Sequence, residues 1–221
     1  MPAPNTVVSN RLPASERRAE IVSAAADIAL DQGLERITLR GVASALGVRA
    51  GLISHYFPEA EALVAAAFSH NAATEREELF SESQESTIDR VVAFLDRVLD
   101  AESVKNHQLW LSARNLSRYN AQLRSALNQE ESANRERLTR LIATGVADGV
   151  FATADPERSS LLILLVVDAF ASYTYEEYSP VSPLLRGLLF TTAERAVEVP
   201  EGTLLARSTA GEAPQGIDDQ L

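Results

Sequence analysis

The chain has 221 residues, no cysteine and a formal net charge of −11. The lack of cysteine excludes a disulfide framework, a thiolate metal site and a cysteine nucleophile. No apolar run reaches the ~20 residues that a membrane helix needs, and residues 1–9 lack the basic and apolar regions of a signal peptide. We therefore expect a cytoplasmic protein with no membrane partner.

The charges are distributed unevenly along the chain. Residues 1–58 hold six Arg and five acidic residues, whereas the remaining residues hold 14 basic and 26 acidic ones. The N-terminal part is close to neutral, and the rest is strongly acidic. Because the distribution of charge matters more than its total for nucleic-acid binding, the negative net charge does not exclude a DNA site in the N-terminal part.

Apolar residues recur at helical spacing along the chain, and neither an alternating strand pattern nor an internal repeat stands out. In the N-terminal part, Ser15 and Thr38 are placed to cap helices, and Gly33 and Gly47 are placed to end them. These signals predict four helices, at Ser15–Gln32, Leu39–Leu46, Ala50–Phe57 and Glu59–Phe80.

Longer helices are expected past Ser81. Asp155 and Pro156 form a strong start signal, since a carboxylate cap is followed by proline at the first helical position. The expected helices are Thr87–Asp100, Ser103–Ser117, Gln122–Ala147, Asp155–Glu176 and Leu184–Val197. Residues 1–13 contain three prolines and are expected to form a flexible arm. The Gly-, Pro- and acid-rich residues 201–221 are expected to be disordered.

The segment around Gly47 has the pattern of a helix-turn-helix, in which two short helices pack across a tight turn. Glycine suits the turn because it adopts a left-handed backbone that a β-carbon disfavours. In this motif the N-terminal part of the second helix enters the major groove of DNA. Taken alone, the pattern also fits an ordinary helical hairpin. Small or apolar residues stand where the two helices must touch: Val42, Ala43, Leu46, Val48, Ile53 and Tyr56.

The longer string ITLRGVASALGVRAGLISHYFPEAEALV, preceded by a helix, resembles the TetR family of repressors. The likeness covers about Arg17–Phe68, and its stretch Gly-Leu-Ile-Ser-His-Tyr-Phe is most similar to the BetI-like branch. The matching positions are Thr38, Val42, Ala43, Gly47, Val48, Gly51, Tyr56, Phe57 and Leu63. Three residues depart from the family pattern: Arg49 replaces Ser, Ser54 replaces a frequent Tyr, and Ala60 replaces a Lys that commonly meets phosphate.

The resemblance implies an all-α fold in four parts: a flexible arm at 1–13, a three-helix DNA-binding head at 14–58, a larger ligand-binding and dimerisation domain at 59–200, and a tail at 201–221. It also implies a homodimer on double-stranded operator DNA. The DNA-binding residues that it implies are Thr38, Arg40, Arg49, Ala50, Gly51, Leu52, Ser54, His55 and Tyr56. Arg11, Arg17 and Arg18 are candidates for further phosphate contacts.

A ligand cavity among the middle helices is a further implication of the resemblance. His107, Trp110 and Arg114 are spaced i, i+3 and i+7, so they share one helix face. Arg114 and Asp168 are charged residues in apolar surroundings, where a buried charge needs a partner. The residues expected to contact a small, largely apolar effector are Phe94, His107, Trp110, Arg114, Tyr119, Asp168, Phe170 and Tyr173.

The sequence thus favours a ligand-responsive repressor over two alternatives. The first is a DNA-binding regulator of the same fold without a small ligand, and the second is an all-α enzyme or scaffold with a coincidental hairpin. No catalytic site and no cofactor are expected, because neither a Gly-rich phosphate loop nor a Gly-x-Ser-x-Gly elbow occurs. No metal site is expected, because the three histidines lack metal-ligand spacing.

Overall fold

The computed structural model describes residues 13–81, 86–100, 103–173 and 183–208. Within these residues all regular structure is helical, so the predicted all-α fold is confirmed. The helices are α1 (Ala14–Gln32), α2 (Leu39–Ala45), α3 (Ala50–Tyr56), α4 (Ala60–Leu79), α5 (Thr87–Val98), α6 (Val104–Leu116), α7 (Ala121–Ala147), α8 (Pro156–Tyr173) and α9 (Pro183–Val197). Two short 3₁₀ turns, η1 (Leu34–Arg36) and η3 (Leu205–Arg207), accompany them.

Local capping signals set several helix ends. Thr38 caps α2, because its Oγ1 accepts a hydrogen bond from the backbone N–H of Gly41 at 3.0 Å. Asp155 caps α8 in the same way, accepting from the N–H of Arg158 at 3.0 Å. The prediction for Ser15 was wrong: α1 begins at Ala14, after Pro13, and has no side-chain cap.

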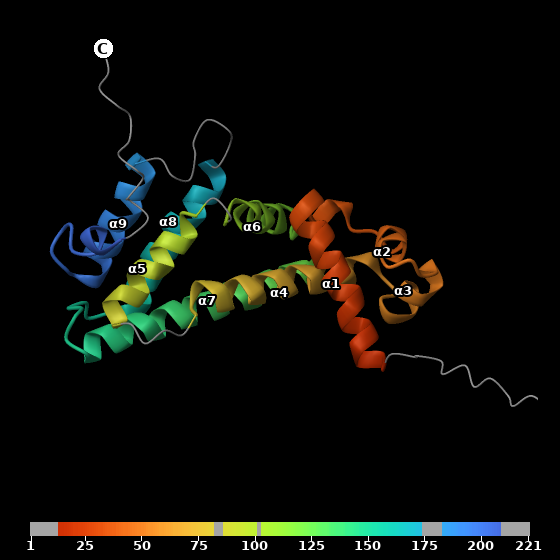
Figure 1. Ribbon diagram of the computed structural model, residues 1–221, viewed down its shortest axis with the longest axis horizontal. Helices are drawn as coiled ribbons and strands as arrows, with labels where there is room; N and C mark the ends of the chain where they lie inside the picture. Colours follow the sequence, from red (N-terminus) through yellow and green to blue (C-terminus); the bar gives the residue numbers. More distant parts are fainter. Residues whose placement is uncertain (1–12, 82–85, 101–102, 174–182, 209–221) are drawn as a thin grey trace, which may run out of the picture.

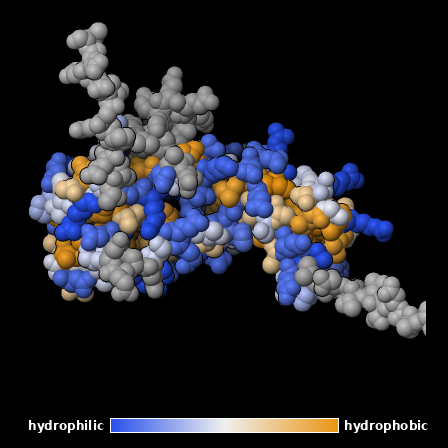
Figure 2. Space-filling model, viewed as in Figure 1, coloured by the Kyte–Doolittle hydropathy of each residue, from blue (hydrophilic) through white to orange (hydrophobic). Residues whose placement is uncertain are grey.

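The molecule is elongated, with α1, α2 and α3 at one end and α5, α8 and α9 at the other (Figure 1). The long helices α4 and α7 pack against each other and connect the two ends. On the face shown in Figure 2, hydrophilic residues cover most of the middle, and hydrophobic surface lies nearer the two ends. No helix in the described parts of the chain is long and apolar enough to cross a membrane.

Two apolar clusters form the interior of the described chain. The first joins the three N-terminal helices to α4, α6 and the start of α7, through buried residues such as Ile21, Phe68 and Leu123. The second joins α5, α7, α8 and α9 around Leu95 and Phe190. The core of the N-terminal helices therefore continues into α4 and α6, so a movement of either helix acts on the head directly.

Residues 201–208, which were assigned to a disordered tail, are folded against α9, and this is a correction. The buried carboxylate of Glu194 accepts hydrogen bonds from the backbone N–H groups of Gly202, Leu204 and Leu205, at 2.9, 2.8 and 3.1 Å. Leu204 is fully buried. The polar composition of this segment predicts disorder, but Leu204 is a buried apolar side chain and the Glu194 carboxylate accepts hydrogen bonds from the backbone of the turn. Residues 209–221 and 1–12 lie outside the described part of the chain.

Candidate functional site

Helices α2 and α3 form the helix-turn-helix that the spacing around Gly47 predicts. Gly47 has φ +65°, the left-handed conformation that the turn requires. Val42 and Ala43 of α2 and Ile53 of α3 are buried where the two helices meet. Leu46, Val48 and Tyr56 are partly buried and pack against the same cluster.

The residues expected to contact DNA lie on the outside of this pair of helices. Thr38, Arg40, Arg49, Gly51, Ser54 and His55 are exposed, and Ala50, Leu52 and Tyr56 are half-buried. Neither Arg40 nor Arg49 has an ion-pair partner among the described residues, so both guanidinium groups are available to a phosphate or a base edge.

Gly51 leaves the start of α3 uncovered. A β-carbon built at this position would have no neighbouring atom within 4 Å. A helix start that carries no side chain allows the backbone to approach a flat surface closely. Of the candidate arm contacts, Arg17 is paired with Glu20, Arg18 lies over the Phe57 ring at 4.7 Å, and Arg11 falls outside the described residues.

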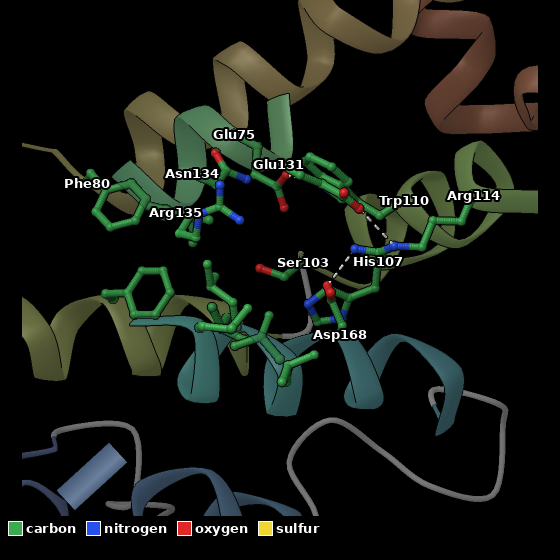
Figure 3. A pocket seen from close by; sticks show the side chains of 17 residues that line it. Glu75, Phe80, Ser103, His107, Trp110, Arg114, Glu131, Asn134, Arg135 and Asp168 are labelled. Carbon is green, nitrogen blue, oxygen red and sulfur yellow. Dashed lines mark hydrogen bonds and ion pairs between the residues drawn. The ribbon is translucent and has the colours of Figure 1, made fainter. Parts of the chain in front are cut away.

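A cavity of about 240 Å³ lies between α4, α5, α6, α7 and α8 (Figure 3). Its wall is mainly apolar, with several polar and charged groups directed into it. The residues that line it are Glu75, Leu79, Phe80, Phe94, Val98, Ser103, His107, Trp110, Arg114, Glu131, Asn134, Arg135, Leu161, Leu164, Leu165, Val167 and Asp168. Apolar cavities with a few placed polar groups are typical of small-molecule sites.

Arg114 and Asp168, the two charged residues singled out in the sequence, form an ion pair of 2.8 Å across this cavity wall. Arg114 also pairs with Glu131 at 3.2 Å and lies 5.8 Å from the centre of the Trp110 ring. Partial burial raises the pKa of Asp168 above its ordinary value, and the charge of Arg114 opposes that rise. The cation on α6 is therefore already matched by carboxylates from α7 and α8.

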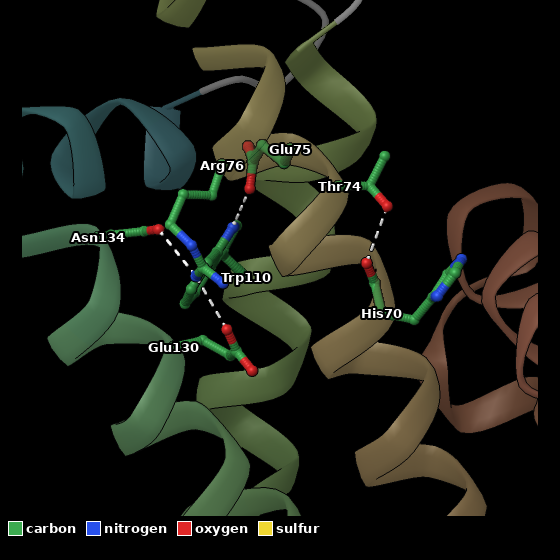
Figure 4. A network of polar contacts seen from close by, with 7 residues as sticks. All are labelled: His70, Thr74, Glu75, Arg76, Trp110, Glu130 and Asn134. Carbon is green, nitrogen blue, oxygen red and sulfur yellow. Dashed lines mark hydrogen bonds and ion pairs between the residues drawn. The ribbon is translucent and has the colours of Figure 1, made fainter. Parts of the chain in front are cut away.

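Glu75 of α4 is the buried carboxyl group of the cavity. Its Oε2 accepts a hydrogen bond of 2.6 Å from Trp110 Nε1, and burial raises its pKa to about 7 despite that bond (Figure 4). The adjacent Arg76 turns away to Glu130 and Asn134, at 2.9 and 3.3 Å. No Arg or Lys in the described chain forms an ion pair with Glu75.

His107 is the second unusual polar group in the cavity. It is 6 % exposed, and its Nδ1 is buried without any hydrogen-bond partner. Burial lowers the pKa of His107 to about 4, so the imidazole is neutral at pH 7. A buried polar atom without a partner is rare in proteins, because leaving it unpaired costs free energy.

The structure brings together most of the residues expected at the cavity. Phe94, His107, Trp110, Arg114 and Asp168 all line it. Tyr119 does not: it lies in the turn between α6 and α7 with 86 % of its surface exposed. Phe170 and Tyr173 belong to α8, and their side chains lie outside the described part.

Glu75 was missed in the sequence, although a signal for it was present. Phe68, Ala72, Glu75 and Leu79 recur at spacings of four, three and four, so a carboxylate interrupts the apolar face of α4. No group of three His, Asp or Glu residues in the described ranges is placed to hold a metal ion.

A helix-turn-helix with unpaired arginines, joined to an all-α body with an internal cavity, defines a class of DNA-binding regulators. Residues 21–67 match the family model of the bacterial regulatory proteins of the tetR family. Residues 21–67 therefore have the N-terminal domain of this family, which confirms the resemblance to TetR regulators for this part of the chain, and the likeness to the BetI-like branch stays a prediction. No curated protein matches the sequence.

Solved structures share the fold over 79 to 88% of this chain. A putative TetR-family transcriptional regulator from Rhodococcus sp. is 24% identical, with a TM-score of 0.68 over 83% of this chain and 99% of that chain. Salmonella enterica GusR is 18% identical, with a TM-score of 0.67 over 88% and 100%. A putative transcriptional regulator from Saccharomonospora viridis, in complex with choline, is 20% identical, with a TM-score of 0.60 over 79% and 94%.

Proposed function

We propose that this transcriptional regulator binds a palindromic operator as a homodimer and is released from it by a small molecule in the cavity. The observation that carries the proposal is the position of α6. His107, Trp110 and Arg114 of this helix line the cavity. On the same helix, Lys105 Nζ pairs with Asp31 Oδ1 of α1 at 2.7 Å, and Leu109 is buried in the N-terminal cluster.

Helix α4 provides a second connection between the cavity and the head. It begins at Ala60, four residues after α3 ends, and carries Glu75 and Leu79 into the cavity wall. A ligand that displaces α4 or α6 would change the spacing of two heads in a dimer. A ligand that favours a spacing unsuited to the operator lowers the affinity for DNA by a population shift.

The homodimer is proposed from the apolar surface of α8 and α9. These helices pack against each other and carry exposed leucines, including Leu162 on α8 and Leu184 and Leu188 on α9. Leu184 and Leu188 are 78 and 55 % exposed, which is unfavourable for large apolar side chains unless another surface covers them. Two such helix pairs can form a four-helix bundle across a two-fold axis.

The cavity favours a ligand-responsive regulator over a regulator of the same fold without a small ligand. A volume of about 240 Å³ suffices for a small organic molecule, and a collapsed second domain would have no such space. The complex of the Saccharomonospora viridis regulator with choline supports the idea that this fold accepts a small molecule. As for a regulator of this class, we propose a location in the cytoplasm.

Selection of binding sites from random double-stranded DNA, using the full-length protein, tests the proposal. The expected result is an enriched sequence with two half-sites related by two-fold symmetry. Trp110, the only tryptophan, then reports effector binding by its fluorescence, with and without operator. By linkage, a releasing ligand must bind more weakly to the DNA complex. Enrichment of no sequence would contradict the proposal. So would a ligand that releases the operator without changing the Trp110 fluorescence and that still releases the Trp110→Phe variant.

A further inference from the structure

The two most buried polar side chains of the cavity, Glu75 and His107, both have unfilled capacity to accept a hydrogen bond. Glu75 receives one hydrogen bond, from Trp110, and has no ion-pair partner among the described residues, although it is only 8 % exposed. Removing a carboxylate from water costs free energy that a single neutral donor does not offset. Glu75 therefore lacks a cation or a second hydrogen-bond donor, and the cavity is where a ligand could supply one.

His107 provides the second acceptor. A neutral imidazole carries a proton on one ring nitrogen and leaves the other as an acceptor. Nδ1 is buried in the cavity wall with no partner in the described chain. A ligand with N–H groups could donate to the acceptor nitrogen of this ring on α6 and to the Glu75 carboxylate on α4, and both residues line the same cavity (Figure 3).

The remaining charges of the cavity do not replace this missing donor. Arg114 is held by Asp168 and Glu131, so its charge is already neutralised. Arg135 has no ion pair in the described ranges, but it is half-buried and keeps contact with solvent, which screens its charge. The lining residues hold three carboxyl groups against two guanidinium groups, so the formal balance also favours a cation.

The rest of the wall fits an apolar body. Phe80 and Phe94 stack with their ring centres 5.0 Å apart. Leu161, Leu164 and Leu165 of α8 also line the cavity. The edge of the Trp110 ring lies beside Glu75, so the carboxylate borders this apolar part of the wall.

We infer that the cavity binds a protonated primary or secondary amine with an apolar body, whose N–H groups donate to Glu75 and to the acceptor nitrogen of the His107 ring. This inference rests on the proposed function only in placing the effector in this cavity. The ammonium group supplies the positive charge that Glu75 lacks and the donor that His107 lacks. The aliphatic or aromatic remainder fills the space between Phe80, Phe94 and α8.

Isothermal titration calorimetry at pH 8, where Glu75 is ionised, tests the inference with phenylalkyl amines of two to four methylene groups. The matched controls are the alcohols and carboxylic acids of the same carbon skeletons. We expect the best amine to bind roughly 10- to 100-fold more tightly than its alcohol, the range of a hydrogen bond to a charged group. Equal binding, a preference for the carboxylate, or no saturable binding of any amine overturns the inference.

Variants of Glu75 and His107 test which of the two side chains produces the preference for amine over alcohol. Glu75→Gln keeps the shape and an acceptor for Trp110, and it is expected to abolish the preference for amine over alcohol. Glu77→Gln removes the same charge from an exposed position of the same helix and should leave the preference unchanged. His107→Phe should weaken amine and alcohol alike, by several-fold, since both lose an acceptor. A Glu75→Gln protein that still prefers the amine would contradict the assignment.

The outcome for DNA separates this inference from the proposed function. An amine that binds through Glu75 but does not release the operator would contradict the proposed release mechanism and leave the ligand class intact. An effector of another class that releases the operator, with no amine bound, would support the mechanism and overturn the ligand class.

Discussion

Trp110 Nε1 donates a hydrogen bond of 2.6 Å to Glu75 Oε2, and this contact connects α6 to α4 at the cavity wall. The same tryptophan ring packs edge-on against Phe68, whose ring centre is 5.0 Å away. One side chain thus contacts both the cavity carboxylate and the core beneath the DNA-binding head. Any ligand that changes the position of Glu75 acts on both helices that lead to the head.

Glu75→Gln should stabilise the protein at alkaline pH. Burial raises the pKa of Glu75 from its ordinary value of 4.5 to about 7, so the folded state keeps the proton longer than the unfolded state. That contribution to stability is fully present below pH 4.5 and is lost as the pH rises through about 7. The variant should exceed the wild type by up to roughly 3 kcal/mol above pH 7 and match it near pH 4.5, in urea unfolding across this range.

The control for this prediction is Glu77→Gln, which changes an exposed carboxylate two positions along α4, on another side of the helix. Its stability difference from the wild type should not vary with pH. Parallel pH profiles of the wild type and Glu75→Gln would show that the carboxyl of Glu75 titrates normally.

Two glycines of the helix-turn-helix should respond to alanine in opposite directions. Gly47→Ala should cost about 1 kcal/mol, because φ +65° is unfavourable for any residue with a β-carbon. Gly51→Ala should stabilise by up to about 1 kcal/mol, since the position lies in α3 and has free space. Guanidinium unfolding measures both. Gly51→Ala should also weaken operator binding, and unchanged affinity would argue against close approach of α3 to DNA.

Replacing Arg40 or Arg49 by alanine should weaken operator binding without unfolding the head. Loss of an Arg that contacts a base should cost roughly 1–3 kcal/mol of binding free energy and relax specificity at one base pair. Loss of an Arg that contacts a phosphate should reduce the slope of log affinity against log salt concentration by about one. Fluorescence anisotropy over a series of salt concentrations distinguishes the two. Arg158→Ala, an exposed arginine at the start of α8, is the charge-matched control. If both head variants behave like this control, the docking of α3 is wrong.

The double variant Leu184→Glu/Leu188→Glu should be a monomer, because it places two charges on the exposed apolar face of α9. The wild type should sediment as a dimer at micromolar concentration. Val150→Glu, at a position that is 37 % exposed and outside α8 and α9, should remain a dimer. A monomeric wild type would refute the proposed interface.

Leu204 should contribute to stability, whereas its neighbour Leu205 should not. Leu204 is fully buried beneath the turn that Glu194 holds, so Leu204→Ala should cost roughly 2–5 kcal/mol. Leu205 is 42 % exposed, and Leu205→Ala should change the free energy of unfolding by less than about 1 kcal/mol. Equal effects in urea unfolding would mean that residues 201–208 do not hold this position in solution.

The sequence determined the features that depend on local structure. Thr38 caps the start of α2, and Asp155, followed by Pro156, caps the start of α8. Gly47 adopts the left-handed backbone of the turn between α2 and α3. Each depends on residues within one turn of helix, so spacing alone predicts it. The shared face of His107, Trp110 and Arg114 is predictable for the same reason, since helical periodicity fixes which side chains point together.

Only the tertiary structure decided which groups meet across helices. The partner of Arg114 is Asp168, 54 positions later in the chain, and the partner of Trp110 is Glu75, on another helix. Tyr119 fits an aromatic cavity by type, but the turn after α6 exposes it. These outcomes depend on how five helices pack around one cavity, because packing, rather than residue type, sets which side chains lose water and which find a partner.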